Sequence, residues 1–316
     1  MIGFVPLLLF DHNENILWKN SNPNSTENFF PLEIIFEKEN GLSTNNIFKK
    51  YMSFFSEKNN FDFKLIVLPT MMGQKSINAC CILKDGAKGV DTHLCYLCSL
   101  RSSCQNSFQN LSKEYSANDQ FLIFAISPLH AFLNVTKFII YNISPTINNF
   151  SKQEINSRLE SAFNIHFNEI RRGFGTKITG NVARLFFENT HLFSKTIVLP
   201  THFIENFKKI LYFIRSKERI DMQHYEIVCK DIIKYLSMNK IHITPTIHKI
   251  LFHGHQIISF IQNLGASEPG VFSEEAIEAS IRKIRKIRKE NSRLISRKCN
   301  NKDTLINSYI YNKFDF

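Results

Sequence analysis

Two short motifs in this chain combine the residue types that bind transition metals. The first is Cys95-Tyr-Leu-Cys98 and the second is His248-Lys-Ile-Leu-Phe-His253. Thiolate sulfur and imidazole nitrogen are common ligands of Zn²⁺, and two of each complete a tetrahedral structural site. Both spacings fall within the range found in such sites. The sequence therefore predicts a Cys2His2 zinc centre built from Cys95, Cys98, His248 and His253.

An alternative reading of these motifs stays open, because a long stretch of sequence separates the two pairs. On an ideal α-helix, five residues turn through about 500°, which leaves ~140° between the two imidazoles. The four residues would then be two surface cysteines and two hydrogen-bonded helix histidines. His93, Cys104 and His255 are rival ligands for the same site.

Acidic and basic residues form a second chemical feature near the C-terminus. The segment Ser273-Glu-Glu-Ala-Ile-Glu278 places carboxylates in the first turn of a predicted helix, where the helix dipole favours negative charge. Ile281, Ile284 and Ile287 then recur every third position with Lys and Arg between them, which predicts a helix with an apolar seam and cationic flanks. Such a carboxylate beside cations fits phosphodiester chemistry on DNA, and it also fits a capped, solvated surface helix.

Composition limits the classes of protein that this chain can belong to. The 316 residues are 43% hydrophobic and 13% aromatic, which excludes a disordered chain and allows one large or two small domains. The net charge is +11, and from residue 271 onward 11 Lys and Arg face 6 Asp and Glu, which favours a nucleic acid as partner. Asn, Ile, Lys and Phe are abundant throughout, so an AT-rich coding sequence is an alternative source of the lysines. Seven cysteines without a regular framework indicate a reducing compartment. The apolar residues 1–10 are too short to span a bilayer and lack a basic leader, so no membrane association is expected.

The chain reads as strands followed by helices, which predicts an α+β architecture. Strands are expected at 5–10, 16–19, 32–37, 61–68 and 77–83, with a helix over 43–55. Helices are expected at 127–142, 151–170, 180–188, 201–216 and 222–238. A further helix begins at Thr244-Pro245, ahead of the basic helix.

These motifs together resemble the Transib DNA transposases and their relative, the catalytic subunit of the V(D)J recombinase. The resemblance is carried by Thr246-Ile-His-Lys, by the Glu278 segment and by the basic helix. It extends in the same order to Leu68-Pro-Thr-Met-Met, to the Cys95 motif and to Gly180-Asn-Val-Ala-Arg. It implies a ribonuclease-H-like mixed sheet, incomplete at the N-terminus, with a large helical insertion and a C-terminal basic helix. The implied domains are a partial sheet over 1–90, a zinc-linked helical insertion over 91–270, and a final catalytic-type helix with a basic tail over 271–316.

The resemblance also implies roles for individual residues. Members of this family cut DNA with three acids that hold two metal ions. Glu278 matches the third acid, whereas Gly73 stands at the position of the second, and the first would lie upstream of the segment 5–9. We therefore expect a DNA-binding remnant of a transposase core without nuclease activity, which would need Mg²⁺ or Mn²⁺ only if it were active.

The expected partner is DNA, with a possible homodimer and a nuclear location. Phosphate contacts are expected from five residues of the basic segment: Arg282, Lys283, Arg285, Arg288 and Arg293. Asn181 and Arg184 of the Gly180 segment are expected to bind DNA as well. Two other hypotheses stay open. One is an active transposase completed by an upstream segment or another subunit, and the other is a protein-interaction module that does not bind DNA.

Overall fold

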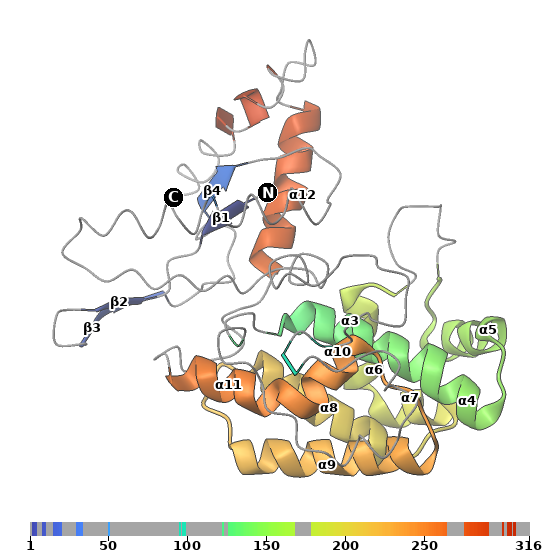
Figure 1. The fold of residues 1–316 in the computed structure, drawn as a ribbon. Helices are drawn as coiled ribbons and strands as arrows, with labels where there is room; N and C mark the ends of the chain where they lie inside the picture. The colour runs from blue at the N-terminus through green and yellow to red at the C-terminus, as the bar shows by residue number, and fades with distance from the viewer. Residues whose placement is uncertain are drawn as a thin grey trace. The chain divides into compact units, whose positions relative to one another are not determined.

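The computed structural model describes part of the chain: residues 2–4, 8–10, 15–20, 30–33, 50, 95, 97, 98, 122, 126–167, 178–263, 275–290, 299, 302–304, 306 and 307. Figure 1 shows the path of these segments. The chain divides into two compact units, one formed by Met1–Val67 with Val271–Phe316 and the other by Leu68–Gly270. Each unit is described by itself.

The second unit is helical wherever its structure is described, apart from short turns and connections. Helix α3 passes without interruption through the π-helical turn η5 into α4, and α10 passes in the same way through η6 into α11. Its elements are α3 (Pro128–Phe138), η5 (Ile139–Ile143), α4 (Ser144–Asn148), α5 (Lys152–Phe163), α6 (Gly180–Glu188), α7 (Thr190–Ile197), α8 (Thr201–Arg215), α9 (Met222–Met238), α10 (Pro245–His248), η6 (Lys249–His253) and α11 (Gly254–Asn263).

Side-chain caps begin several of these helices where the sequence predicts a start. The Ser127 hydroxyl accepts a hydrogen bond from the His130 N–H, and Pro128 follows as the first helical residue. The Ser151 hydroxyl accepts from the Glu154 N–H at 3.1 Å. The helices predicted at 127–142, 180–188, 201–216 and 222–238 are confirmed.

Two helix predictions need correction. Helix α5 ends at Phe163 and not near 170, because Asn164 takes a left-handed conformation (φ 50°) that closes the helix. Helix α7 was not predicted. It is a short element that ends at Val198, another left-handed residue (φ 55°).

Aromatic rings fill the core between these helices. Phe186 of α6 stacks on Phe193 of α7 with ring centroids 4.8 Å apart, and both side chains are fully buried. Phe163 of α5 meets the Phe186 ring edge-on, also at 4.8 Å. Phe138 of α3 packs edge-on against Phe207 of α8. The helices therefore bury their apolar faces against one another.

Among the described residues of the first unit, four short strands pair two by two. Strand β1 (Ile2–Phe4) pairs antiparallel with β4 (Phe30–Glu33), and β2 (Leu8–Phe10) pairs antiparallel with β3 (Ile16–Lys19). The predicted strand at 16–19 is confirmed. The predicted strands at 61–68 and 77–83 lie outside the described residues.

The predicted α+β fold with a ribonuclease-H-like mixed sheet is wrong for the described part of the chain. That part is predominantly helical, and its strands form two separate two-stranded ladders. The physical reason is that alternation of apolar and polar residues favours an extended segment but does not specify its partner. The apolar positions from 127 to 263 follow the helical period instead, and they find their partners in other helices.

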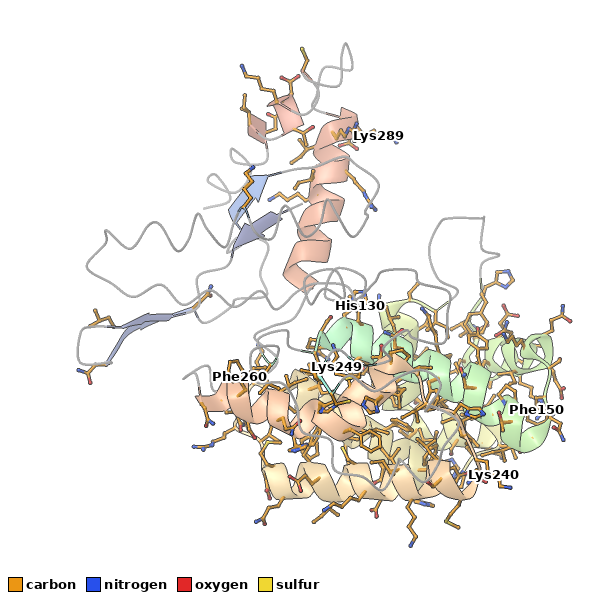
Figure 2. All side chains as sticks on the ribbon, viewed as in Figure 1. His130, Phe150, Lys240, Lys249, Phe260 and Lys289 are labelled. Atoms are coloured by element: carbon orange, nitrogen blue, oxygen red, sulfur yellow. The ribbon has the colours of Figure 1, made fainter. Side chains whose placement is uncertain are left out.

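The predicted basic helix is present in the first unit as α12 (Glu275–Glu290). Ile284 and Ile287 are 7% and 4% exposed, so two positions of the expected apolar seam are buried. Arg285, Lys286 and Lys289 are exposed on the same helix, where Lys289 is labelled in Figure 2. Among the described helices, none is long and apolar enough to cross a membrane.

The stacked rings predict a test of the helical core. Replacing Phe186 by Ala removes a fully buried ring, so we expect the free energy of unfolding to fall by about 3–5 kcal/mol. Urea denaturation followed by circular dichroism measures this. Leu192→Ala on neighbouring α7 is the matched control, because Leu192 is 39% exposed and should change stability little. Equal effects of the two substitutions would contradict the assigned core.

Candidate metal centre

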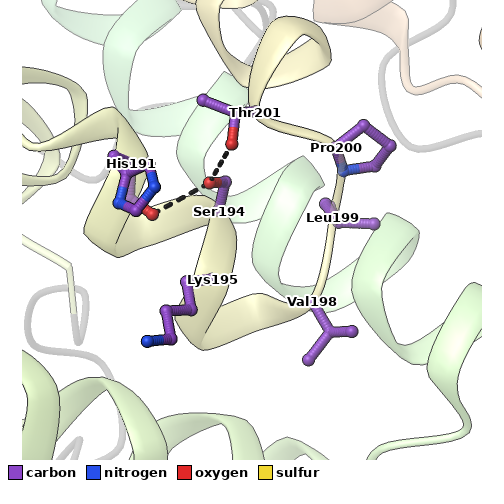
Figure 3. Close-up of a pocket in the computed structure, with 7 residues that line it drawn as sticks. All are labelled: His191, Ser194, Lys195, Val198, Leu199, Pro200 and Thr201. Atoms are coloured by element: carbon purple, nitrogen blue, oxygen red, sulfur yellow. Dashed lines mark hydrogen bonds between the residues drawn. The ribbon is translucent and has the colours of Figure 1, made fainter.

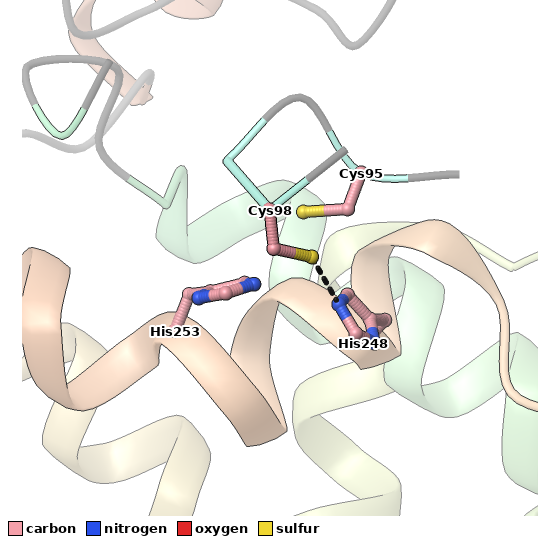
Figure 4. A group of neighbouring side chains, drawn as sticks. All are labelled: Cys95, Cys98, His248 and His253. Carbon is pink, nitrogen blue, oxygen red and sulfur yellow. Dashed lines mark hydrogen bonds between the residues drawn. The ribbon is translucent and has the colours of Figure 1, made fainter. Parts of the chain in front are cut away.

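Cys95, Cys98, His248 and His253 meet at one point of the helical unit. One ligand atom from each residue, two sulfurs and two ring nitrogens, lies within 4.8 Å of all the others. In Figure 4 the two cysteines lie on one side of the group and the two histidines on the other. Cys98 Sγ lies 3.3 Å from His248 Nε2, although the two residues are 150 positions apart in the sequence. The predicted convergence of the two motifs is confirmed.

A turn supplies the two cysteines. Leu97 and Cys98 lie in this turn, which brings the Cys95 and Cys98 thiols to the same side of the backbone. Leu97 is only 2% exposed and anchors the turn in the core. Cys95 is buried and Cys98 is half-buried.

A π-helical turn brings the two histidines together. His248 is the last residue of α10, and His253 is the last residue of η6. In a π-helical turn the backbone hydrogen bonds run to the fifth residue, so residues five apart lie nearly above one another. The two imidazole centroids are 5.2 Å apart. The wider turn thus removes the ~140° divergence that an α-helix would impose.

Contacts behind the two rings orient them. His253 Nδ1 lies 2.9 Å from Gln256 Oε1, an oxygen that only accepts, so this contact suits the tautomer in which Nε2 would be the metal-binding nitrogen. The His248 ring stacks on Phe252 with centroids 4.8 Å apart and an interplanar angle of 22°. Both imidazoles are fully buried.

The electrostatic environment favours the thiolate form of Cys95. A hydrogen bond from Cys98 is the largest influence and lowers the pKa of the Cys95 thiol, and His248 and His253 lower it further. Burial acts in the opposite direction but does not prevail. Since metals bind thiolate and not thiol, this environment suits a ligand. Two sulfur and two nitrogen donors in a compact, buried group fit a divalent transition-metal ion.

The remaining residues predicted for function lie elsewhere or outside the described residues. Glu278 and Arg282 belong to α12, but their side chains are not described, and Gly73 and Arg293 are outside the described residues. The expectation that Glu278 faces Gly73 therefore stays a prediction. The rival ligands His93 and Cys104 also lie outside the described part.

The other predicted DNA contacts occupy two helices. On α12, Arg285 is exposed, whereas Lys283 and Arg288 are half-buried. Asn181 is exposed and Arg184 half-buried on α6 of the helical unit. The two helices belong to different units, so each set is described by itself.

One contributor to the centre was missed from the sequence. Gln256 follows His253 by three positions, and a polar residue at that spacing on a helix can reach back to the ring. That spacing is recognisable in the sequence only once His253 is taken as a ligand. His255, a rival ligand, is not among the grouped residues.

A shallow pocket at the junction of α7 and α8 is a second feature of the helical unit. Figure 3 shows its lining side chains. The Ser194 hydroxyl donates to the His191 backbone carbonyl at 2.9 Å and lies 2.8 Å from the Thr201 hydroxyl. Ser194 therefore bonds to the His191 backbone and not to its ring, and these contacts are those of a helix end and not of an activated nucleophile. The lining residues are His191, Ser194, Lys195, Val198, Leu199, Pro200 and Thr201.

Comparison with known proteins does not assign the chain to a family. No protein-family model and no curated protein matches the chain. The site is therefore defined by its geometry and donor chemistry: four side chains that could hold a metal ion.

The geometry predicts stoichiometric metal binding. We expect the protein to bind one equivalent of Co²⁺, a spectroscopic substitute, with the strong visible absorption of a tetrahedral sulfur- and nitrogen-ligated ion. Cys98→Ser should reduce the sulfur-to-cobalt charge-transfer band, and His253→Gln should weaken binding. Cys299→Ser is the control, since Cys299 lies in the other unit, and it should leave the spectrum unchanged. Unaltered spectra for both ligand variants would rule out this site.

Proposed function

We propose that this protein is a DNA-binding protein whose helical unit is stabilised by a structural zinc ion. The observation that carries the proposal is the convergence of Cys95, Cys98, His248 and His253. Four protein donors satisfy tetrahedral zinc completely, whereas catalytic zinc sites keep one position for water or substrate. The burial of three of the four residues also favours a structural role.

The zinc ion would join two distant parts of the helical unit. The cysteine turn and the α10–η6 segment are 150 positions apart at the Cys98–His248 contact. Closing such a long loop costs conformational entropy, and a bound metal offsets that cost with ligand bonds that the unfolded chain lacks. Zinc binding would therefore contribute directly to the free energy of folding.

Helix α12 supports the DNA-binding part of the proposal. Ile284 and Ile287 anchor one side of the helix, which leaves Arg285, Lys286 and Lys289 exposed. Clustered cations without a base-reading pattern favour contacts with phosphates. Such contacts bind the protein to DNA without sequence preference. The resemblance to Transib transposases supports the same partner, and we propose a nuclear location on the same ground.

The proposal excludes nuclease activity. Two-metal cleavage of a phosphodiester needs several carboxylates, because each Mg²⁺ takes oxygen ligands in near-octahedral geometry. The resemblance assigns acids to positions 73 and 278. Position 278 is a glutamate, but position 73 is a glycine. The Cys2His2 group cannot replace them, because its donors are sulfur and nitrogen.

The salt dependence of DNA binding tests the proposal. Each phosphate contact releases about one condensed counterion. In a plot of log affinity against log salt concentration, Arg285→Ala should therefore make the slope less steep by about one unit. A gel-shift titration of the zinc-loaded protein with two unrelated duplexes measures the slope. Lys209→Ala, an exposed cation of α8, is the matched control and should leave the slope unchanged.

Other outcomes would favour the alternatives. Absence of DNA binding at low salt would refute the DNA-binding role and favour a protein-interaction module. Loss of binding to only one of the duplexes would show base recognition by α12 and contradict phosphate contacts.

Nuclease inactivity is a separate expectation. Purified protein should neither nick nor join DNA in Mg²⁺ or Mn²⁺, because Gly73 stands where the resemblance places the second acid and a two-metal site needs several carboxylates. Supercoiled plasmid relaxation is a sensitive readout of single nicks. Metal-dependent nicking that Glu278→Gln abolishes would overturn this expectation and support an active enzyme.

A further inference from the structure

The π-helical turn η6 is the unusual backbone on which the centre depends. Ordinary α-helix borders it on both sides, as α10 and α11. A π-helical turn is rare and usually occurs as a single turn inserted in an α-helix, frequently at a functional site. Residues outside the ligand set must therefore favour the wide turn over a continuous α-helix.

Tyr225 contacts this turn from another helix. It lies in the first turn of α9 and is 1% exposed. Its hydroxyl donates to the Ile250 carbonyl, inside η6, at 2.9 Å. Burial is the main cause that raises the pKa of this hydroxyl well above its usual value, so the hydroxyl remains a hydrogen-bond donor at neutral pH. The bond gives a carbonyl of the widened turn a donor from outside its own helix.

Gly254 makes room for this contact. It is the residue directly after His253, and its backbone is ordinary helix (φ −56°, ψ −41°). Glycine is therefore not needed there for its backbone conformation. A Cβ at this position would overlap the Tyr225 hydroxyl oxygen and lie 2.7 Å from Tyr225 Cζ. The missing side chain lets the tyrosine approach the turn, which is a use that only glycine serves.

We propose that Tyr225 and Gly254 are positioning residues of the metal centre, which hold η6 in the wide register that turns His248 and His253 toward the same ion. Neither residue is a ligand. This inference rests on the proposed zinc function and extends it to residues outside the ligand group.

The proposal follows from how strongly helix register controls the direction of His253. If the segment relaxed to a continuous α-helix, the two imidazoles would diverge by ~140° and could not share one ion. A contact that favours the wide turn in the metal-free protein places the ligands before the ion arrives. Residues behind the ligands typically change metal affinity 10–100-fold through such pre-positioning.

Metal affinity of the full-length protein tests the proposal. Zn²⁺ affinity is measured by competition with a chromophoric chelator, and the cobalt spectrum reports ligand geometry. Tyr225→Phe keeps the ring and removes only the hydroxyl, so we expect about tenfold weaker Zn²⁺ binding and a less intense tetrahedral Co²⁺ spectrum. Gly254→Ala should weaken binding at least as much, because its Cβ displaces the tyrosine.

Two matched controls separate positioning from general destabilisation. Tyr141 lies in the π-helical segment η5, and its hydroxyl donates to Asn156 at 3.1 Å. Tyr141→Phe removes that hydroxyl. Gly180→Ala places a Cβ 2.8 Å from a flexible Leu129 methyl, which can move aside. Both controls should retain wild-type metal affinity.

The possible results decide between the claims. Tyr225→Phe and Gly254→Ala affinities within about twofold of wild type would overturn the positioning role while leaving the zinc centre intact. An equal loss of thermal stability in zinc-loaded and zinc-free Tyr225→Phe protein would also overturn it, because weaker Zn²⁺ binding must destabilise the zinc-loaded protein more than the zinc-free one. Failure of the wild-type protein to bind Zn²⁺ would instead refute the proposed function on which this inference rests.

Discussion

The register of one helical turn determines whether this protein has a metal centre. The five-residue spacing of His248 and His253 is unfavourable for joint ligation on an α-helix and favourable on a π-helical turn. In η6 the two rings come within 5.2 Å of each other between centroids. The π-helical backbone is less common than the α-helical one. Ile250 and both imidazoles are fully buried. A local change of backbone hydrogen bonding thus converts two divergent side chains into a chelating pair.

The surrounding helices support that turn from several directions. Helix α9 contacts both η6 and α11, and α3 contacts α10, so elements from distant parts of the sequence meet around the centre. The Asn134 amide of α3 donates to the Thr246 hydroxyl of α10 at 3.4 Å, a weak polar link across this junction. The phenylalanine cluster of α5, α6 and α7 packs on the same unit and fixes the helices relative to one another. The phenylalanine cluster thus stabilises the unit that holds the ligands, although it contains none of them.

Local signals in the sequence predicted the helices and the ligands better than they predicted the fold. The cap at Ser151 and the proline at 245 depend on neighbouring residues alone, so they are readable without tertiary structure. The ligand set could be predicted because few residue types bind transition metals. The wide turn could not, because its register depends on Tyr225, which lies 25 positions before Ile250. The mixed sheet failed for a related reason: the residues of β2 and β4 favour strands, but pairing is decided by segments that local pattern does not identify.

The distance between Cys98 and His248 along the chain has a consequence for how the protein is made. Proteins emerge from the ribosome N-terminus first, so the cysteine turn appears 150 residues before its first histidine partner. During the synthesis of α3 to α9, neither His248 nor His253 has yet been added to share an ion with the two thiols. Oxidation of Cys95 and Cys98 to a disulfide in that interval would remove both sulfur ligands before η6 exists. The centre is thus most vulnerable during translation, and a reducing environment at the ribosome protects it until the last ligand has been added to the chain.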